Sequence, residues 1–275
     1  MNLAYEAATA DLNDVNMIDP FHLQAYGETT VNYNRDVEVF PVLAAMFEQI
    51  MGESPYKSPT DMGVNMVGNC IVDNEVVCAA ARQEIIRRYY AALCDRRRGQ
   101  GSDDTIYKLE LLMKQAQATT ALRPVISAAE SRADETGEPA AAIQLPDGTI
   151  VTGKTTELMG ASSAALLNAL KVLAGIDDEV HLISRAAIEP IQEVKVKHLG
   201  SQNPRLHSDE ILIALAISAA TDPLAAKALD MVGTLRDCDA HSSVILSTAD
   251  SKTYSRLGMH LTCTPRYQSN KLFHR

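Results

Sequence analysis

Apolar residues in the first half of the chain recur with the period of an α-helix. Between residues 73 and 99, apolar positions return every three or four residues, after a polar start at Asp73 and before three arginines and Gly99. A polar cap, an apolar stripe and a basic last turn are typical of one long helix. This segment therefore predicts a helix that packs through one face.

Two further helices follow, each with its own start signal. Ser102 is a suitable N-cap for the second, and Pro124 opens a third that ends near Gly137. Residues 36–136 are therefore predicted to form a helical subdomain. Residues 1–35 are polar and rich in turn-forming residues, and they are predicted to wrap onto the rest of the protein.

The pattern changes to alternating strands and helices after residue 136. β-branched runs on either side of Asp147-Gly148 predict a β-hairpin. The segment ILIALAIS that follows Ser208 is apolar all round, which predicts a buried helix. The other expected elements are a helix over 160–175, a short strand over 181–184, helices that begin at Pro190 and Pro223, and strands over 241–247 and 259–265. This order predicts that residues 137–275 form a layered α/β subdomain.

A hairpin followed by a helix, a strand and another helix resembles the cytidine deaminase-like fold. Zinc-dependent deamination needs H-x-E at the start of the first helix and P-C-x-x-C at the start of the second. Ala161-Ser162-Ser163 and Ser184-Arg185-Ala186 stand at these places. The α/β subdomain is therefore predicted to resemble this fold without its zinc site.

Composition narrows the class of protein. The chain has 275 residues, 46% of them hydrophobic, and a formal net charge of −10, which disfavours binding to nucleic acid or an anionic membrane. The five cysteines are odd in number and never spaced C-x-x-C, as expected for reduced thiols rather than a disulfide scaffold. No stretch approaches the roughly 20 apolar residues of a membrane span, and the N-terminus lacks the pattern of a signal peptide. We expect a soluble cytoplasmic protein that binds neither nucleic acid nor membrane.

One segment matches the phosphate-loop pattern G-x-x-x-x-G-K-[ST] letter for letter, from Gly148 to Gly153, Lys154 and Thr155. A phosphate loop needs a flexible turn, whereas the central Ile150 and its neighbour Val151 prefer an extended strand. The hairpin interpretation explains the first glycine through the turn. Lys154 could still meet an anion, because it precedes a predicted helix N-terminus.

Cys238 and His241 form a C-x-x-H pair. A tetrahedral metal site needs three or four ligands, and no second pair is visible nearby in the sequence. The alternative is a cysteine at a strand edge and a hydrogen-bonded histidine. No metal site and no cofactor are predicted.

Two polar loops in the first quarter are candidate ligand-binding segments. The first combines ring, amide and cationic groups, namely His22, Tyr26, Asn32, Asn34 and Arg35. The second carries Lys57, Asp61 and Asn65 between residues that shape turns. The alternative for the first loop is a hydrated loop with a helix cap. Recognition residues are often carried on loops, so we expect these loops to line a cleft.

The second half contributes further candidates. They are Lys154, Thr155, Ser162, Ser163, Arg205 and His207. Ser208 and the acidic residues after it explain this last stretch as a helix cap, but a cap does not need Arg205 or His207.

These candidates support two hypotheses. In the first, the chain is part of an enzyme that binds a small anionic or phosphorylated metabolite, held by Arg35, Lys57 and Lys154, while His22 or Asp61 moves a proton. In the second, the chain is a non-catalytic module whose polar surface docks a partner domain or subunit.

Several long segments together resemble one bacterial family. They are DPFHLQAYGETTVNYNRDVEVFPVL, GESPYKSPTDMGVNMVGNCIVD, QEIIRRYYAALC, LPDGTIVTGKT, MGASSAALLNALK, NPRLHSDEILIALAI and AHSSVILS. The chain resembles the domain of unknown function 1846 family, also called uncharacterised protein family 0371. The resemblance covers nearly the whole chain and implies no settled activity.

The resemblance also carries an expectation about length. Members of this family are roughly twice as long, and their N-terminal half carries a glycine-rich segment that looks like a nucleotide-phosphate loop. The chain is therefore predicted to be the C-terminal half alone. The expected macromolecular partner is either an N-terminal nucleotide-binding domain or a second copy of the chain.

Overall fold

A computed structural model describes residues 46, 49–52 and 74–268. The chain divides into two compact units, Met1–Leu122 and Arg123–Arg275. The first polar loop and the second polar loop both lie outside the described residues.

The first unit contains a helical hairpin. Its described elements are α5 (Asn74–Arg98), α6 (Asp103–Gln115) and the short 3-10 helix η2 (Thr120–Leu122). Ser102 is the N-cap of α6 and accepts a hydrogen bond from the Thr105 backbone N–H. Arg82 on α5 donates to the Ala116 carbonyl oxygen at 2.8 Å, which ties α5 to the end of α6. The predicted long helix and its capped successor are confirmed.

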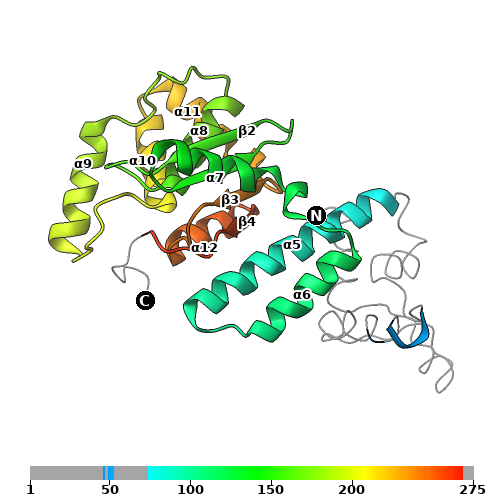
Figure 1. Ribbon diagram of the computed structural model, residues 1–275. Helices are drawn as coiled ribbons and strands as arrows, with labels where there is room; N and C mark the ends of the chain where they lie inside the picture. Colours follow the sequence, from blue (N-terminus) through cyan, green and yellow to red (C-terminus); the bar gives the residue numbers. More distant parts are fainter. Residues whose placement is uncertain (1–45, 47–48, 53–73, 269–275) are drawn as a thin grey trace, which may run out of the picture. The chain divides into compact units, whose positions relative to one another are not determined.

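The second unit is a mixed α/β structure around a small sheet (Figure 1). Its strands are β1 (Ala140–Gln144), β2 (Ile150–Lys154), β3 (Asp239–Ser242) and β4 (His260–Cys263). They lie in the order β2-β1-β3-β4, with β1 antiparallel to both neighbours and β3 parallel to β4. Its helices are α7 (Pro124–Thr136), α8 (Ala161–Leu173), α9 (Arg185–Glu193), the π-helical η3 (Val194–His198), α10 (Ser208–Ala219), α11 (Pro223–Asp230), the 3-10 helix η4 (Met231–Leu235) and α12 (Thr248–Arg256). The α/β class is confirmed.

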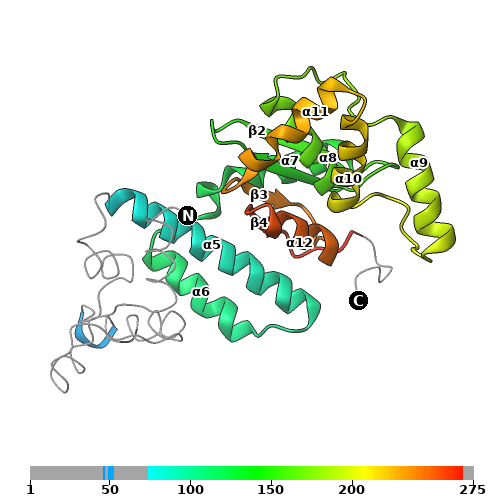
Figure 2. The same ribbon diagram turned by 180° about the vertical axis from the view of Figure 1, so that it is seen from behind.

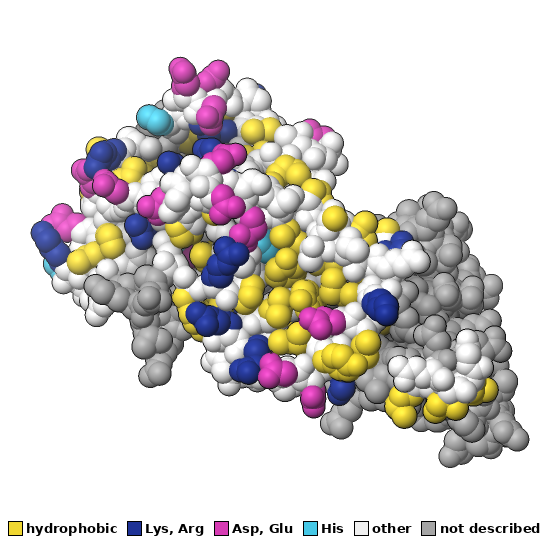
Figure 3. All heavy atoms as spheres, in the orientation of Figure 1, with side chains coloured by type: hydrophobic (Ala, Val, Ile, Leu, Met, Phe, Trp, Pro, Cys, Tyr) yellow, Lys and Arg dark blue, Asp and Glu magenta, His cyan; other side chains and the backbone are white. Residues whose placement is uncertain are grey.

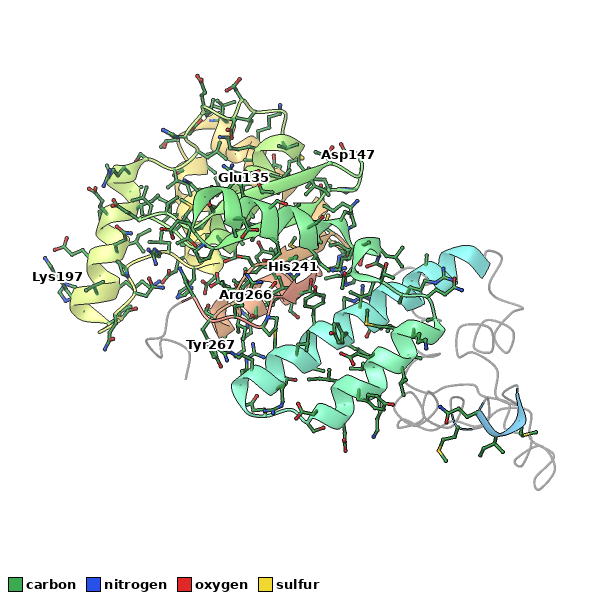
Figure 4. All side chains as sticks on the ribbon, viewed as in Figure 1. Glu135, Asp147, Lys197, His241, Arg266 and Tyr267 are labelled. Atoms are coloured by element: carbon green, nitrogen blue, oxygen red, sulfur yellow. The ribbon has the colours of Figure 1, made fainter. Side chains whose placement is uncertain are left out.

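The β1–β2 hairpin accounts for the phosphate-loop pattern. Asp147 lies at the tip of the hairpin (Figure 4), and Gly148 has a φ of 87°, which favours glycine. Gly153 is a strand residue paired with Ala141. A Cβ at Gly153 would lie 2.1 Å from the backbone nitrogen of Ala165, so the close approach of α8 requires glycine there. The hairpin interpretation is confirmed, because these residues form a strand and not a phosphate-binding turn.

Helices cover both faces of the sheet, as the two opposite views show (Figure 1, Figure 2). Strand β1 alternates: Ala142 packs against α7, whereas Ala141 and Ile143 face the larger core that includes α8. Successive strand residues point to opposite faces, so both layers bury apolar side chains of the same strand. The small alanines of β1 let both helices approach the sheet closely.

The strand expected over residues 181–184 does not form, and this expectation was wrong. Leu182 and Ile183 are buried, but the backbone there bends and joins no strand ladder. Ser184 instead caps α9, its side chain accepting from the Ala187 backbone N–H. A short apolar run is typical of a buried strand, but the same pattern also fits a buried segment that is not a strand. The strand after α8 is β3, much later in the chain.

The first unit ends before α7, whereas the sequence pattern placed the domain boundary after residue 136. Helix α7 continues the helical pattern of the preceding residues, but it packs on the sheet through Val125 and Ala129. Helical periodicity shows that an apolar face exists, not which layer covers it.

Helix α10 is less buried than its sequence suggested. Ile211 and Leu215 are buried, while Ile213 is 61% exposed and Ile217 is 65% exposed. The prediction of a helix buried all round was wrong, because α10 lies at the outer layer with one side uncovered by the described residues.

Among the described residues, no helix combines the length and apolar character needed to cross a membrane. Basic and acidic side chains lie interspersed on the face of the second unit seen in Figure 3.

Candidate functional site

The N-termini of α8, α10 and α12 meet at one place in the second unit. An isolated parallel bridge joins Met159 to Leu206, just before α8 and α10 begin. The Gly160 backbone N–H donates to the Leu206 carbonyl oxygen at 3.2 Å, and Ser163 Oγ donates to the same oxygen at 3.0 Å. These bonds hold the loops that enter the two helices side by side.

Asp250, in the first turn of α12, links the three helix starts. Its Oδ1 accepts from Ser162 Oγ at 3.0 Å, from Ser208 Oγ at 2.7 Å and from the Ser208 backbone N–H at 2.8 Å. Its Oδ2 accepts from Ser247 Oγ at 2.6 Å and lies 2.8 Å from His207 Nδ1. The carboxylate therefore satisfies donors from all three helices, and the serines and His207 surround it.

The hydrogen bond between Asp250 and His207 shifts the pKa values of both groups. The hydrogen bond to Asp250 raises the pKa of His207 above its ordinary value, although burial opposes this. Burial by itself raises the pKa of the Asp250 carboxyl, but hydrogen bonds from His207, Ser247 and Ser208 outweigh burial and hold it well below its ordinary value. Asp250 thus stays ionised at neutral pH, and it favours a protonated His207.

A small hollow opens beside this pair. It is lined by the starts of α8, α10 and α12 and by the loop that carries Arg205, and its volume is about 30 Å³. Helix α8 has Gly160 at its N-cap and no side-chain cap. Within the described residues, the backbone N–H groups of Ala161 and Ser162 donate to no acceptor. Free N–H groups at a helix start favour an anion.

The loop before α10 is fixed by a buried cation. Lys195, 5% exposed, donates to the Arg205 carbonyl oxygen at 2.7 Å and to Glu210 Oε2 at 2.6 Å. Glu210 also accepts from the His207 backbone N–H at 2.7 Å. Arg205 in turn donates through Nε to the Thr156 carbonyl oxygen at 2.8 Å. These contacts set the backbone on which His207 is presented.

The structure brings together several residues singled out in the sequence. Thr155, Ser162, Arg205 and His207 all line the hollow. Ser163 is fully buried, and its Oγ donates to the Leu206 carbonyl oxygen in the loop before α10. Lys154 is exposed at the end of β2 and is not among the residues that line the hollow.

The remaining candidates lie outside the described residues. They are His22, Tyr26, Asn32, Asn34, Arg35, Lys57, Asp61 and Asn65. Their expected convergence with the later half stays a prediction.

Sequence reasoning missed Asp250, the residue at the centre of the cluster. A local signal exists, because Ser247-Thr-Ala-Asp250 has the spacing of a helix cap, and Ser247 does accept from the Asp250 backbone N–H. That pattern predicts a helix start only. Nothing local in the sequence shows that the same carboxylate meets His207.

His241 of the C-x-x-H pair belongs to a buried polar network on the α7 side of the sheet (Figure 4). Its ring nitrogens lie 2.8 Å from Thr262 Oγ1 and 3.0 Å from Thr264 Oγ1. Burial and the nearby Arg123 guanidinium lower the pKa of His241 to about 3, so it is neutral. The interpretation as a hydrogen-bonded histidine is confirmed. In the part of the chain that the structure describes, no three potential ligands cluster as a metal site would require.

The fold and the cluster define the second unit as a mixed α/β domain in which a buried carboxylate and a half-buried histidine pair at the meeting point of three helix starts. The model for the N-terminal domain of unknown function DUF1846 matches residues 1–117, and the model for its C-terminal domain matches residues 121–273. The chain belongs to this family.

Two relatives show how much of the family the chain spans. It is 55% identical over 273 residues to UPF0371 protein cu0538 of Corynebacterium urealyticum, and 56% identical over 273 residues to a UPF0371 protein of Streptococcus pneumoniae strain JJA. Each alignment covers 99% of this chain and 55% of the relative. The chain thus spans about half the length of the curated relatives it matches.

The family matches correct one expectation. The chain was predicted to correspond to the C-terminal half of the family alone, but residues 1–117 match the N-terminal family model. The prediction took a glycine-rich phosphate-binding segment as the mark of the family's N-terminal half. The N-terminal family model nevertheless matches residues of this chain. The docking of a separate nucleotide-binding domain stays a prediction.

Proposed function

We propose that this chain binds a small anionic metabolite through its charged head group, in the hollow beside His207, as part of an enzyme in which His207 holds or moves a proton. The observation that carries the proposal is the Asp250–His207 pair beside the uncapped start of α8. Asp250 engages Nδ1, which leaves Nε2 of His207 for a ligand or a proton.

The size of the hollow limits what it can hold. A volume of about 30 Å³ accommodates a water molecule or a single oxygen-bearing group, not a whole metabolite. The head group would accept from the N–H groups of Ala161 and Ser162 and face the positive charge of His207. Arg205 lies on the same rim. The rest of the ligand would extend out of the hollow.

Sulfate is a suitable probe, because hydrogen sulfate is a much stronger acid than protonated histidine, so sulfate keeps its double negative charge over the pH range in which a histidine titrates. We expect sulfate to raise the melting temperature most at low pH and progressively less as the pH rises through the raised pKa of His207. Sulfate should stabilise less at higher pH, because a histidine with a raised pKa carries its positive charge below that pKa and loses it above. His207→Gln should weaken sulfate binding about tenfold at pH 6, since a hydrogen bond to a charged group is lost.

His198→Gln is the matched control, because His198 is exposed on η3 and does not line the hollow. It should keep both the affinity for sulfate and its pH dependence. Equal sulfate affinity in the His207→Gln variant and the unchanged protein would contradict the proposal.

A second candidate is a non-catalytic assembly module whose partner is another copy of the chain. It is supported by the exposed Ile213 and Ile217, which lie four residues apart on one side of α10. Two copies of one helix face can pair around a two-fold axis. Ile213→Lys combined with Ile217→Lys is expected to convert a dimer to a monomer in sedimentation velocity. An unchanged sedimentation coefficient would exclude this surface.

A relation of the second unit to the cytidine deaminase-like fold is supported by the β1–β2 hairpin followed directly by α8, although residues 181–184 form no strand. Ser162 and Ser163 occupy the place of H-x-E, so zinc-dependent deamination is not proposed. A cytoplasmic location is supported by the small, odd number of cysteines.

A further inference from the structure

A second, larger cavity lies on the other side of the loop that leads into α8. Its volume is about 420 Å³, within the range of small-molecule sites. It is lined by residues of α8, of the loop before α8 and of the segment over residues 180–188. None of the residues that line it also lines the hollow beside His207.

The walls of this cavity are mostly apolar. Leu167, Leu182, Ile183 and Ile188 are buried residues of the main core, and each also lines the cavity. Their positions are held without a strand ladder, because Ser184 caps α9 and Lys171 donates to the Asp178 carbonyl oxygen. A fixed apolar wall of this kind suits the hydrocarbon part of a ligand.

The ionisable groups in the lining are all basic residues. They are Lys171, His181 and Arg185, and no carboxylate is among the lining residues that the structure describes. Arg185 donates through Nε to Glu189 Oε1 at 2.7 Å, and its terminal nitrogens donate to no other group among the described residues. An exposed arginine beside an apolar cavity favours an acid group at the edge of the ligand.

We propose that this cavity binds a small amphipathic organic anion, with an aromatic or branched apolar body and one acid group. The body packs against Leu167, Ile183 and Ile188, and the acid group lies at Arg185. This site is separate from the hollow beside His207 and does not depend on the function proposed there.

Two dyes with the same apolar body test the proposal. 8-Anilinonaphthalene-1-sulfonate carries a sulfonate, and N-phenyl-1-naphthylamine does not. Fluorescence titration of the full chain should show binding of both. Ala164→Phe places a ring in the cavity from α8 and should weaken both dyes at least tenfold. Arg185→Gln should weaken only the sulfonate, about threefold, because the arginine is exposed to solvent.

Ala186→Phe is the matched control, because Ala186 is exposed on α9 and does not line the cavity. It should bind both dyes as the unchanged protein does. Circular dichroism checks that the variants are folded, and Arg185→Gln keeps the test decisive if Ala164→Phe does not fold. Undiminished dye binding by folded Ala164→Phe, or equal loss of both dyes in Arg185→Gln, would overturn the proposal. His207→Gln should leave dye binding unchanged, which separates this site from the hollow.

Discussion

The Asp250→Ala variant is expected to lose about 3 to 5 kcal/mol of the free energy of unfolding, as when one partner of a buried ion pair is removed. The carboxylate accepts from Ser162, Ser208 and Ser247 and pairs with His207, so alanine leaves buried donors from three helix starts without an acceptor. Urea denaturation followed by circular dichroism measures the change.

The same experiment repeated at several pH values reports on the charge of Asp250. Its pKa is lowered in the folded protein, so its contribution to stability is present above the ordinary carboxyl pKa and is lost as the pH falls below it. The difference between the unchanged protein and Asp250→Ala should therefore shrink in acid. Asp134→Ala, at an exposed position on α7, should change stability by less than about 0.5 kcal/mol. If the two variants were equally stable, the cluster would not hold the helices together.

Gly153→Ala is expected to destabilise the second unit by on the order of 3 kcal/mol, the upper part of the range for overpacking. The added Cβ would lie 2.1 Å from the backbone nitrogen of Ala165 and 2.5 Å from the carbonyl carbon of Ala164. Both are backbone atoms of α8, so relief requires the helix to move away from β2. The urea midpoint of the variant measures the cost.

Gly233→Ala is the appropriate comparison, because no atom lies within 4 Å of the added Cβ and the backbone there does not require glycine. It should leave the urea midpoint nearly unchanged. A Gly153→Ala variant as stable as Gly233→Ala would show that α8 does not pack as closely on β2 as the structure indicates. It would also reopen the question of why glycine stands at this place in the phosphate-loop pattern.

Local patterns in the sequence were sufficient for most of the elements. The cap at Ser102, the proline at 124 and the Asp147-Gly148 turn each act within a few residues, and each is found where it was predicted. The error at residues 181–184 has a physical reason. A short apolar run must be buried, but its pattern does not tell whether a strand ladder or a bent segment buries it.

The sequence predicted some residues of the candidate site and missed the central one. Arg205 and His207 stood out because a cap at Ser208 does not need them. In the structure His207 is itself the N-cap residue of α10, and both Arg205 and His207 line the hollow. Their partner did not stand out, since Asp250 is separated from Ser162 by 88 positions and from His207 by 43. The exposed side of α10 was likewise hidden, because its sequence is apolar on every face.

The sequence by itself determined where the hairpin and most helices begin, since caps, turns and periodicity act between near neighbours in the chain. Helix α9 is an exception, because it begins at Arg185 with Pro190 inside it, and not at Pro190 as expected. Tertiary structure alone decided that α7 packs on the sheet, that Gly153 faces α8 and that Asp250 meets His207. These contacts depend on how layers pack, and packing joins residues that no local pattern connects.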